Sequence, residues 1–386
     1  MKVLLTTDWY APAVNGVVTS VLNLRKELTA AGHEVKVLTL APGGGKGYVE
    51  DGVTYLPSFD GSKVYPEAII RHPRYKKYLD ELISWNPDIV HSQCEVSTYA
   101  PAKYIAKVCH APLAHTYHTV YEYYVKYLCP IQPVNKKVAA IFSAKTVNKA
   151  DVVIAPSAKI EKLLLEYGVK IPIEIIPTGI DVERFKEEPD PDWIKAKKEE
   201  LGIPADATIL LSIGRLAQEK NLGEIVRYLY NMPRKDIYFL VVGQGPYRKT
   251  MDKLVRKFNL QNRVIFTGQV DPKEVNRYYH LGDLFVNASV SETQGLTYIE
   301  ALSAGVPLLC RKDSCLDGIV DDGINGWQYE SEKDFDKCLN QYCDDCELRA
   351  KIKANVKENC TRFSTKNFAK RVEAVYRKLL EEKDGL

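Results

Sequence analysis

Residues 290–300 read Val-Ser-Glu-Thr-Gln-Gly-Leu-Thr-Tyr-Ile-Glu, a turn with a glycine that leads into an apolar helix. The backbone N–H groups at the start of this helix would be unpaired, and the helix dipole would add to their attraction for a phosphate. Glu300, one turn into the helix, could then reach a ribose, while Glu292 would face a sugar. The predicted phosphate contacts are Thr293, Gln294, Gly295 and Leu296. The pattern suits a nucleotide-sugar diphosphate, although an ordinary helix with an acidic first turn would give it too.

Two further motifs follow predicted strands. Residues 212–221 read Ser-Ile-Gly-Arg-Leu-Ala-Gln-Glu-Lys-Asn, which places Arg215 and Lys220 in a loop at the carboxyl end of a strand. Fixed cations at this place would stabilise a diphosphate as it leaves with growing negative charge. Residues 10–18 read Tyr-Ala-Pro-Ala-Val-Asn-Gly-Val-Val and put Gly16 at a helix entrance, where the absence of a Cβ permits close approach of a ligand.

Short β-branched runs alternate with amphipathic helical stretches along the chain, which predicts parallel sheets covered by helices. The predicted strands are 2–6, 34–40, 89–91, 113–116, 152–155, 174–176, 208–213, 238–242, 263–267, 284–287 and 307–310. The predicted helices include 16–31, 221–231, 246–258, 272–281, 296–304 and 363–380. A linker at 177–185, punctuated by proline and glycine, separates two such patterns. We therefore expect two doubly wound α/β domains with a ligand cleft at the carboxyl ends of their strands.

Composition excludes several other classes of protein. The 386 residues are 45% hydrophobic and 27% charged, as in soluble two-domain proteins. No apolar run approaches the roughly 18 residues needed to span a bilayer, and the N-terminus is too quickly polar for a signal peptide, so we expect a cytoplasmic protein. A net charge of +3 does not argue for nucleic acid. Nine scattered cysteines favour reduced thiols over disulfides.

Metal binding is disfavoured by two details. Cys343 and Cys346, near Cys338 and Cys360, lack a second closely spaced cysteine pair, so zinc is the weaker interpretation. Asp190-Pro-Asp192 spells a metal-binding DxD but lies among prolines, and we interpret it as a turn. Because Arg215, Lys220 and helix-end amides can hold the diphosphate, we expect no metal and no other cofactor.

A basic stretch at residues 63–78 interleaves cations with tyrosines and isoleucines. Its candidates for contact with anionic lipid headgroups are Arg71, Arg74, Lys76 and Lys77. A solvated helix face would read the same way, and the sequence leaves both interpretations open.

Taken together, these motifs resemble those of glycosyltransferase family 4, whose members are retaining enzymes of the GT-B fold. The resemblance covers nearly the whole chain. It implies an acceptor-binding domain at 1–180, a donor-binding domain at 181–362, and a C-terminal helix at 363–386 that crosses back to pack on the first domain. Glu292, Arg215 and Lys220 would be catalytic. A histidine facing the donor sugar is implied at the tyrosine-rich segment 114–127, with His118 preferred over His115.

Within the family, residues 291–297, with Gln294 where many relatives carry phenylalanine, and residues 115–119 look like the bacterial diacylglycerol glucosyltransferase branch. That branch implies UDP-glucose as donor, a membrane lipid as acceptor, an α-linked product, a place at the inner face of the cell membrane and an acceptor role for Tyr121. A family 4 enzyme with another donor, such as GDP-mannose or UDP-N-acetylglucosamine, and another acceptor is the alternative. A UDP-sugar 2-epimerase and a non-catalytic nucleotide-sugar binding protein represent other classes. The sequence leaves open the base, the sugar, the acceptor, the number of sugars added and the oligomeric state.

Overall fold

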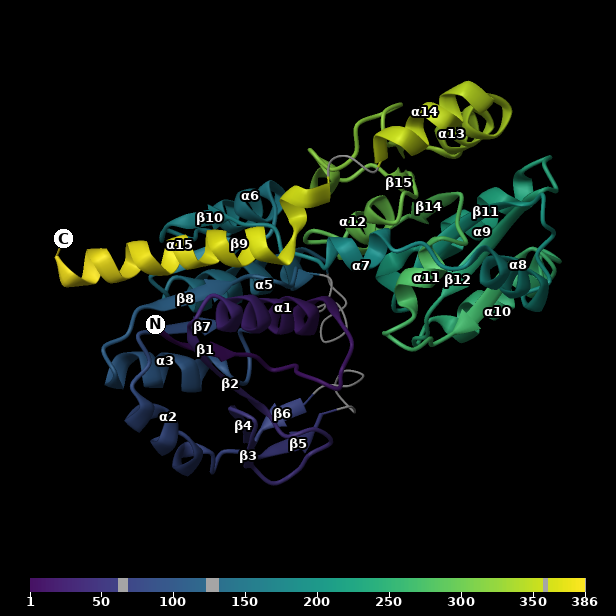
Figure 1. The fold of residues 1–386 in the computed structure, drawn as a ribbon. Helices are drawn as coiled ribbons and strands as arrows, with labels where there is room; N and C mark the ends of the chain where they lie inside the picture. The colour runs from purple at the N-terminus through teal and green to yellow at the C-terminus, as the bar shows by residue number, and fades with distance from the viewer. Residues whose placement is uncertain (62–68, 123–131, 357–359, 386) are drawn as a thin grey trace. The chain divides into compact units, whose positions relative to one another are not determined.

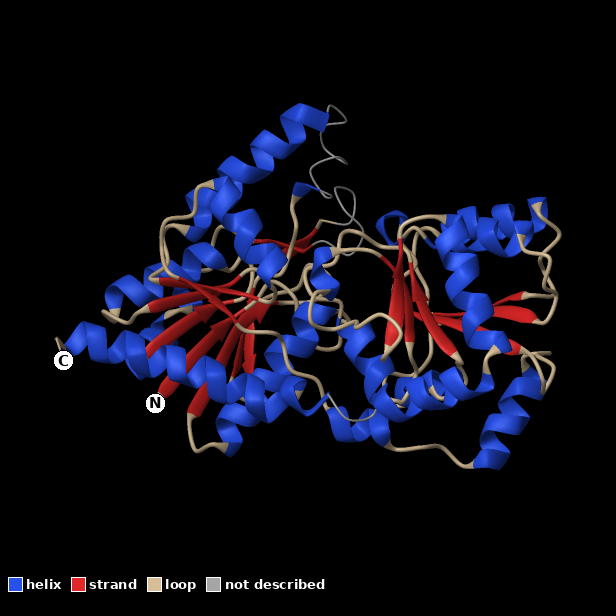
Figure 2. Cartoon of the chain, turned by 90° about the horizontal axis from the view of Figure 1, so that it is seen from above, coloured by secondary structure: helices blue, strands red, loops and turns tan. Residues whose placement is uncertain are grey.

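The computed structural model describes residues 1–61, 69–122, 132–356 and 360–385 (Figure 1). The chain forms two compact units. The first contains Met1–Gly179 together with Thr365–Leu386, and the second contains Ile180–Ser364. In each unit a mostly or wholly parallel sheet lies between helices, as Figure 2 shows with strands in red and helices in blue. This is the doubly wound α/β architecture that the alternating sequence pattern predicts.

The first unit is built on an eight-stranded sheet of order β10-β9-β8-β7-β1-β2-β4-β3. Its pairs are parallel except β3 with β4. The strands are β1 (Lys2–Thr6), β2 (Glu34–Leu40), β3 (Tyr48–Glu50), β4 (Val53–Leu56), β7 (Ile89–Ser92), β8 (Leu113–Thr116), β9 (Val152–Ala155) and β10 (Ile173–Ile175). A separate antiparallel pair joins β5 (Ser58–Asp60) to β6 (Ile69–Arg71).

Alternation of side chains along a strand decides which helices cover each face of this sheet. Val3 and Leu5 of β1 point into one core with α1 and α15, whereas Leu4 points into another with α2 and α3. Helices α5 and α6 enclose a smaller third cluster. The helices are α1 (Gly16–Ala30), η1 (Lys76–Tyr78), α2 (Asp80–Trp85), α3 (Tyr99–Val108), α5 (Gln132–Val147), α6 (Ala158–Tyr167) and α15 (Thr365–Asp384).

Helix α15 returns to the first unit although it follows the whole second unit in sequence. Its buried residues Phe368, Val372, Tyr376 and Leu379 recur every three or four positions, which places them on one helix face. That face packs into the core containing α1, and Figure 1 shows α15 in yellow running beside α1. Helix α15 is therefore part of the first compact unit.

The second unit is built on a six-stranded parallel sheet of order β13-β12-β11-β14-β15-β16. The strands are β11 (Thr208–Ile213), β12 (Ile237–Val242), β13 (Val264–Gly268), β14 (Leu284–Asn287), β15 (Leu308–Arg311) and β16 (Gly326–Tyr329). The helices are α7 (Val182–Lys186), α8 (Pro191–Glu200), η2 (Gln218–Lys220), α9 (Leu222–Asn231), α10 (Arg248–Lys257), α11 (Val275–Tyr279), α12 (Leu296–Ser303), η3 (Ser314–Leu316), α13 (Glu332–Asp344), α14 (Cys346–Val356) and η4 (Cys360–Phe363).

Local expectations differ from the structure in a few places. The Asp190-Pro-Asp192 sequence is not a turn but the start of α8: the Asp190 carboxylate accepts the Asp192 N–H, and Pro191 occupies the first helical position, where its missing N–H costs nothing. The helix expected at 272–281 is limited to Val275–Tyr279. Strands β3, β4, β5, β6 and β16 were not predicted. Of the basic stretch at 63–78, residues 63–68 lie outside the described part of the chain.

Candidate functional site

In each sheet the order of the parallel strands changes direction beside the first strand of the unit. The reversal falls between β1 and β7 in the first unit and between β11 and β14 in the second. At such a point the loops leave the carboxyl ends of neighbouring strands toward opposite faces of the sheet and open a crevice for ligands. The loops that carry most predicted site residues follow these strands.

In the second unit the loops after β11 and β14 bring two predicted residues into direct contact. Lys220 Nζ lies 2.5 Å from Glu292 Oε1, with the two side chains 30% and 13% exposed. Arg215 Nη2 lies 2.8 Å from Glu219 Oε1, four residues further along the chain. Both cations are thus held by carboxylates while part of each side chain stays open to solvent. The arrangement presents two oriented positive charges that can exchange or share their partners with phosphate oxygens.

Backbone-to-backbone packing holds the loop after β11 in place. A Cβ on Gly245 would lie 2.3 Å from the carbonyl oxygen of Leu216, so only glycine permits this approach. The Leu216 N–H also donates to the Gln244 carbonyl at 3.0 Å. The loop following β12 therefore supports the loop that carries Arg215 and Lys220.

A buried carboxylate anchors the end of the same loop. Asn221, which has a left-handed backbone (φ 50°), directly follows Lys220 and donates from its side chain to Glu224 at 2.9 Å. Arg311 at the end of β15 and Tyr329 at the end of β16 donate to the other oxygen of Glu224 at 2.8 and 3.1 Å. Strands β15 and β16, the loop after β11 and the start of α9 are thereby tied together beside Lys220.

Gly295 stands immediately before α12, where the predicted phosphate contacts begin. Its φ of +74° favours glycine, and an added Cβ would meet the ring of Tyr298 at 2.3 Å. Gln294 beside it is buried. Among the described residues no side chain caps the N-terminus of α12. The positive end of the helix dipole at this place suits an anion.

Glu300 lies one turn into α12 and is oriented by a neighbouring helix. The hydroxyl of Tyr279, a fully buried residue at the end of α11, donates to Glu300 Oε2 at 2.6 Å. Burial raises the pKa of the Glu300 carboxyl, while the hydrogen bond from Tyr279 lowers it. Within the described residues no hydrogen bond reaches the other carboxylate oxygen. A ribose hydroxyl could donate to that oxygen without displacing Tyr279.

In the first unit the strand ends carry a buried polar layer. Asp8, two residues after β1, accepts the Ser97 and Thr98 N–H groups at 2.9 and 2.7 Å and the Thr98 hydroxyl at 2.7 Å. Burial nevertheless raises the pKa of the Asp8 carboxyl. These bonds fix the loop after β7 against the loop after β1 at the reversal point.

Glu95, three residues after β7, is a second buried carboxylate in this layer. It accepts from the Tyr121 hydroxyl at 2.5 Å, and its other oxygen lies 3.1 Å from Nε2 of the fully buried His115. The ring of Tyr121 also meets the ring of Phe142 on α5, with 5.1 Å between ring centroids. Tyr121, predicted to contact the acceptor substrate, thus donates its hydroxyl hydrogen bond to Glu95.

His118 and His115 occupy different environments although both belong to the predicted segment. His118, two residues after β8, is partly exposed, and its Nε2 lies 2.8 Å from Gln93 Oε1. Burial, with a smaller contribution from His115, lowers the pKa of His118 to about 3. The fully enclosed His115 contacts only protein, so His118 is the histidine of the two that a ligand can reach. Three other tyrosines of the predicted segment, Tyr123, Tyr124 and Tyr127, lie outside the described residues.

Gly16 is the first residue of α1, directly after β1 and its loop, and it is exposed. The side chain of Asn15 caps this helix by accepting the Val18 N–H at 3.0 Å. A ligand above the end of β1 can therefore approach the start of α1 beside Gly16 without meeting a Cβ.

The predicted lipid contacts divide into two groups. Arg71 is turned toward the protein: its Nε donates to the Ser97 carbonyl at 2.9 Å and its guanidinium lies over the ring of Tyr75. Arg74, Lys76 and Lys77 are exposed, the last two on the short helix η1. The structure thus offers three of the four cations to solvent.

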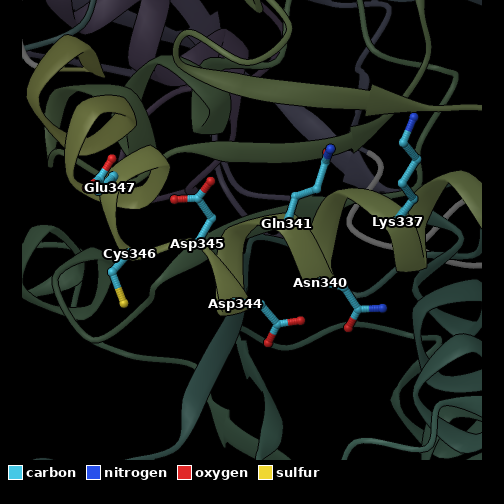
Figure 3. A pocket seen from close by; sticks show the side chains of 7 residues that line it. All are labelled: Lys337, Asn340, Gln341, Asp344, Asp345, Cys346 and Glu347. Carbon is cyan, nitrogen blue, oxygen red and sulfur yellow. The ribbon is translucent and has the colours of Figure 1, made fainter.

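A surface hollow of about 710 Å³ opens elsewhere, between α13 and α14 (Figure 3). Its lining side chains point in different directions and include none of the predicted site residues. In the described ranges no group of three or more His, Cys, Asp or Glu side chains is arranged to hold a metal. No helix in the same ranges has the length and apolarity to cross a membrane.

The sequence interpretation missed the partners that orient these residues. They are Asp8, Gln93, Glu95, Glu219, Glu224, Tyr279 and Arg311. Asp8, Gln93 and Glu95 lie within three residues of the ends of β1 and β7, and polar residues at the carboxyl ends of parallel strands were the available signal. Tyr279 had no such signal because its partner lies on another helix.

Comparisons with known proteins agree with this geometry. The family described as Glycosyltransferase Family 4 matches residues 14–184, and that described as Glycosyl transferases group 1 matches residues 194–359. An alpha-monoglucosyldiacylglycerol synthase of Streptococcus pneumoniae is 31% identical over 97% of this chain and 85% of its own length. The Acholeplasma laidlawii protein of the same name is 29% identical over 99% of this chain and 98% of its length.

The fold has close likenesses among solved structures. The Anabaena protein HepE, solved in complex with UDP and glucose, has a TM-score of 0.76 at 18% identity and covers 98% of this chain and 100% of its own. At this identity the likeness concerns the fold, two Rossmann-like halves with parallel sheets. The chain therefore belongs to glycosyltransferase family 4, and it is a glycosyltransferase of the GT-B fold.

Proposed function

We propose that this glycosyltransferase moves glucose from UDP-glucose to a membrane diacylglycerol and forms an α-glycosidic bond with retention of configuration. The observation that carries the proposal is the pair of oriented cations, Arg215 and Lys220, beside the carboxylate Glu292 at the strand reversal point. The names of the two relatives that align along nearly the whole chain support the lipid acceptor. The UDP and glucose bound by the Anabaena protein support the donor.

The charges of the second unit have a direct role in this reaction. The acceptor hydroxyl attacks the anomeric carbon as the bond from that carbon to the diphosphate oxygen breaks, and UDP leaves with the additional negative charge. Arg215, Lys220 and the start of α12 stabilise that charge. In a front-face mechanism with retention, the hydroxyl proton passes to the departing phosphate. Because cations of the chain neutralise the diphosphate, the proposal requires no metal ion.

The carboxylates and the first unit then orient the sugar and the ribose. Glu292, next to Lys220, faces the sugar, and Glu300, held by Tyr279, binds the ribose through its other oxygen. In the first unit His118 is proposed to bind the transferred sugar, and Gly16 leaves space for a ligand at the start of α1. The first unit also binds the acceptor. In this proposal the phosphates, the ribose and the sugar are each bound by different residues.

Two surfaces of the first unit fit a bilayer with anionic lipids. The first candidate consists of exposed Phe59 and Ile70, which are register partners on β5 and β6, and the exposed cations Arg74, Lys76 and Lys77, which follow β6 in sequence. The other is a face of α5, where exposed Val138, Ile141 and Phe142 lie among Lys136, Lys137 and Lys145. Apolar side chains that enter the interface and lysines that meet headgroups are the elements of reversible membrane binding.

The decisive experiment supplies radiolabelled UDP-glucose, GDP-mannose or UDP-N-acetylglucosamine with vesicles that contain diacylglycerol and an anionic lipid. We expect labelled glycolipid from UDP-glucose, with an α linkage in the isolated product. Transfer from GDP-mannose or UDP-N-acetylglucosamine instead would show that the proposed donor is wrong. Transfer to a soluble acceptor instead would show that the proposed lipid acceptor is wrong. Epimerised sugar without transfer, or binding alone, would contradict the proposal as a whole.

Vesicle sedimentation tests the membrane surfaces separately. Replacing Arg74, Lys76 and Lys77 with serine should weaken binding to anionic vesicles by roughly tenfold or more, since each cation near such a surface contributes about 1 kcal/mol. Raising the salt concentration should mimic the substitution. The matched control replaces the exposed cations Lys249, Arg256 and Lys257 of α10 with serine and should bind normally. Equal binding by both variants would remove the first surface from the proposal.

A further inference from the structure

Gln93 is the only protein partner that the structure gives to the ring of His118 through a hydrogen bond within the described residues. It follows β7 directly, and His118 lies two residues beyond β8. The parallel register pairs Ser92 with His115, so the two loops leave the sheet side by side. Gln93 is 1% exposed and its Nε2 has no hydrogen-bond partner among the described residues, so its contact with His118 is made through Oε1, whereas His118 is partly exposed.

The contact selects one form of the imidazole. The carbonyl oxygen of an amide only accepts, so Nε2 of His118 must carry the hydrogen and donate it to Gln93 Oε1 across 2.8 Å. In the neutral ring the hydrogen then lies on Nε2, and Nδ1 keeps a lone pair that accepts hydrogen bonds. The opposite amide orientation would present Nε2 of Gln93 and would require the other tautomer.

The surroundings keep the ring uncharged. Burial is the main cause that lowers the pKa of His118 to about 3, and the nearby His115 adds to it. The neighbouring carboxylates are already occupied: Glu95 is engaged by His115 and Tyr121, and Asp8 by the loop at Ser97 and Thr98. His91, the third histidine of the layer, has its pKa lowered well below the usual range, again mainly by burial.

We propose that Gln93 is a positioning residue that fixes His118 as the neutral Nε2–H tautomer, so that Nδ1 accepts a hydrogen bond from a hydroxyl of the transferred sugar. The inference rests on the proposed function insofar as His118 faces that sugar. It adds a basis for sugar specificity: a lone pair at this position selects a hydroxyl and disfavours a deoxy sugar or an ether oxygen. A protonated histidine would instead act as a donor and would make transfer fall with rising pH.

The tautomer can be measured without any assay of transfer. In protein labelled with ¹⁵N at histidine, long-range proton–nitrogen spectra distinguish a protonated nitrogen from a bare one, and a His118→Gln variant identifies the signal. The wild type should show hydrogen on Nε2 and no titration of His118 from pH 5.5 upward, since the pKa lies near 3. Hydrogen on Nδ1, or titration near neutral pH, would overturn the inference even if the proposed donor and acceptor are right.

Variants of Gln93 connect the tautomer to catalysis. Gln93→Leu removes the acceptor and should lower kcat about tenfold with little change in KM, because one oriented hydrogen bond is lost. Gln93→Glu keeps an acceptor of the same size but adds a charge that favours imidazolium, so it should keep activity at high pH and acquire a new acid limb. Gln341→Leu, an exposed position on α13, is the matched control and should behave as the wild type.

A comparison of two enzymes with a set of donor analogues tests whether His118 binds a hydroxyl of the sugar. Among monodeoxy analogues of the donor, one should be a poor substrate for the wild type, and the same analogue should be discriminated far less by Gln93→Leu. Rates for Gln93→Leu that equal the wild type, or unchanged discrimination with every analogue, would overturn the inference. If Gln93→Leu does not fold, as judged by its thermal unfolding, the pH profile of Gln93→Glu and the wild-type spectrum still decide. If the proposed lipid acceptor is wrong, the proton–nitrogen spectrum of His118 still tests the tautomer.

Discussion

The two units have a similar topology, but the side chains at the carboxyl ends of their strands differ in charge and burial. In the second unit the loops after β11 and β14 hold charges, in the pairs Lys220 with Glu292 and Arg215 with Glu219, and these side chains stay partly open to solvent. In the first unit the loops after β1, β7 and β8 form a buried, hydrogen-bonded layer that includes His115 and His118. Position in a doubly wound sheet thus fixes where a ligand binds, while the local side chains fix what kind of group it is.

The difference follows from the cost of burial. A partly exposed ion pair gains from solvation and can exchange partners at little cost, which suits a diphosphate that must enter and leave. An enclosed charge would be expensive, so burial lowers the pKa of His91 and of His118, and the carboxylates Asp8 and Glu95 are surrounded by donors. We expect the ion pairs of the second unit to govern turnover. We expect the buried strand-end layer of the first unit to govern stability and the orientation of His118.

The largest effect should come from Glu292→Gln. The substitution preserves the size of the side chain but removes the charge that orients Lys220 and faces the sugar. We expect turnover to fall because the transition state loses about 2 to 4 kcal/mol of stabilisation. Steady-state rates with saturating donor measure this loss. Glu199→Gln on the exposed face of α8 makes the same chemical change outside the site and should be silent. A Glu292→Gln enzyme at wild-type speed would contradict the assignment of charge chemistry to the second unit.

Much of the fold was predictable because strands such as β1, β2, β9 and β11 are short apolar or β-branched runs between polar loops. Strand β16 was not, since Gly326 reads as part of a turn. In the structure this glycine serves a different purpose: a Cβ there would lie 2.3 Å from the Leu308 carbonyl oxygen on β15. Close approach of two backbones leaves no periodic pattern in a sequence.

The site was predictable where one segment carries both the residues and their setting, as at Gly295 and Glu300. It was not predictable where the partner is distant in sequence. Gln93 precedes His118 by 25 residues, and only the parallel register of β7 and β8 brings them together. The commitment of Arg71 to the Ser97 carbonyl likewise depends on packing, which a count of basic residues does not contain.

A second test concerns the buried strand-end layer of the first unit. His91 is fully buried, bonded to Tyr376 and Thr116 at 2.6 and 2.7 Å, and burial holds its pKa well below 6.5. Below about pH 6.5 the unfolded chain therefore binds a proton that the folded chain does not, and stability falls as pH falls, by up to about 1.4 kcal/mol per pH unit for this group.

Replacing His91 with asparagine should remove that part of the slope. Urea titrations between pH 7 and pH 5, read by hydrogen exchange in peptides from β7 and β8, measure the slope for both proteins. His110→Asn is the control, because His110 is exposed and its left-handed backbone (φ 52°) accepts asparagine. Identical slopes for the wild type and His91→Asn would show that the buried layer does not set the acid sensitivity of the first unit.

The smallest effect separates two buried tyrosines of the second unit that differ only in their hydroxyl environment. Tyr279 donates to Glu300 at 2.6 Å, whereas the hydroxyl of Tyr298, equally buried, has no hydrogen-bond partner in the described part of the chain. Tyr279→Phe should therefore weaken donor binding by about 1 kcal/mol, since Glu300 loses the donor that orients it toward the ribose. Its carboxyl would also protonate more easily, so the loss should grow as pH falls. Tyr298→Phe deletes an unpaired hydroxyl and should leave donor affinity unchanged. Calorimetry with UDP compares the two variants, and equal losses would mean that the tyrosine rings, rather than the bond to Glu300, shape the donor site.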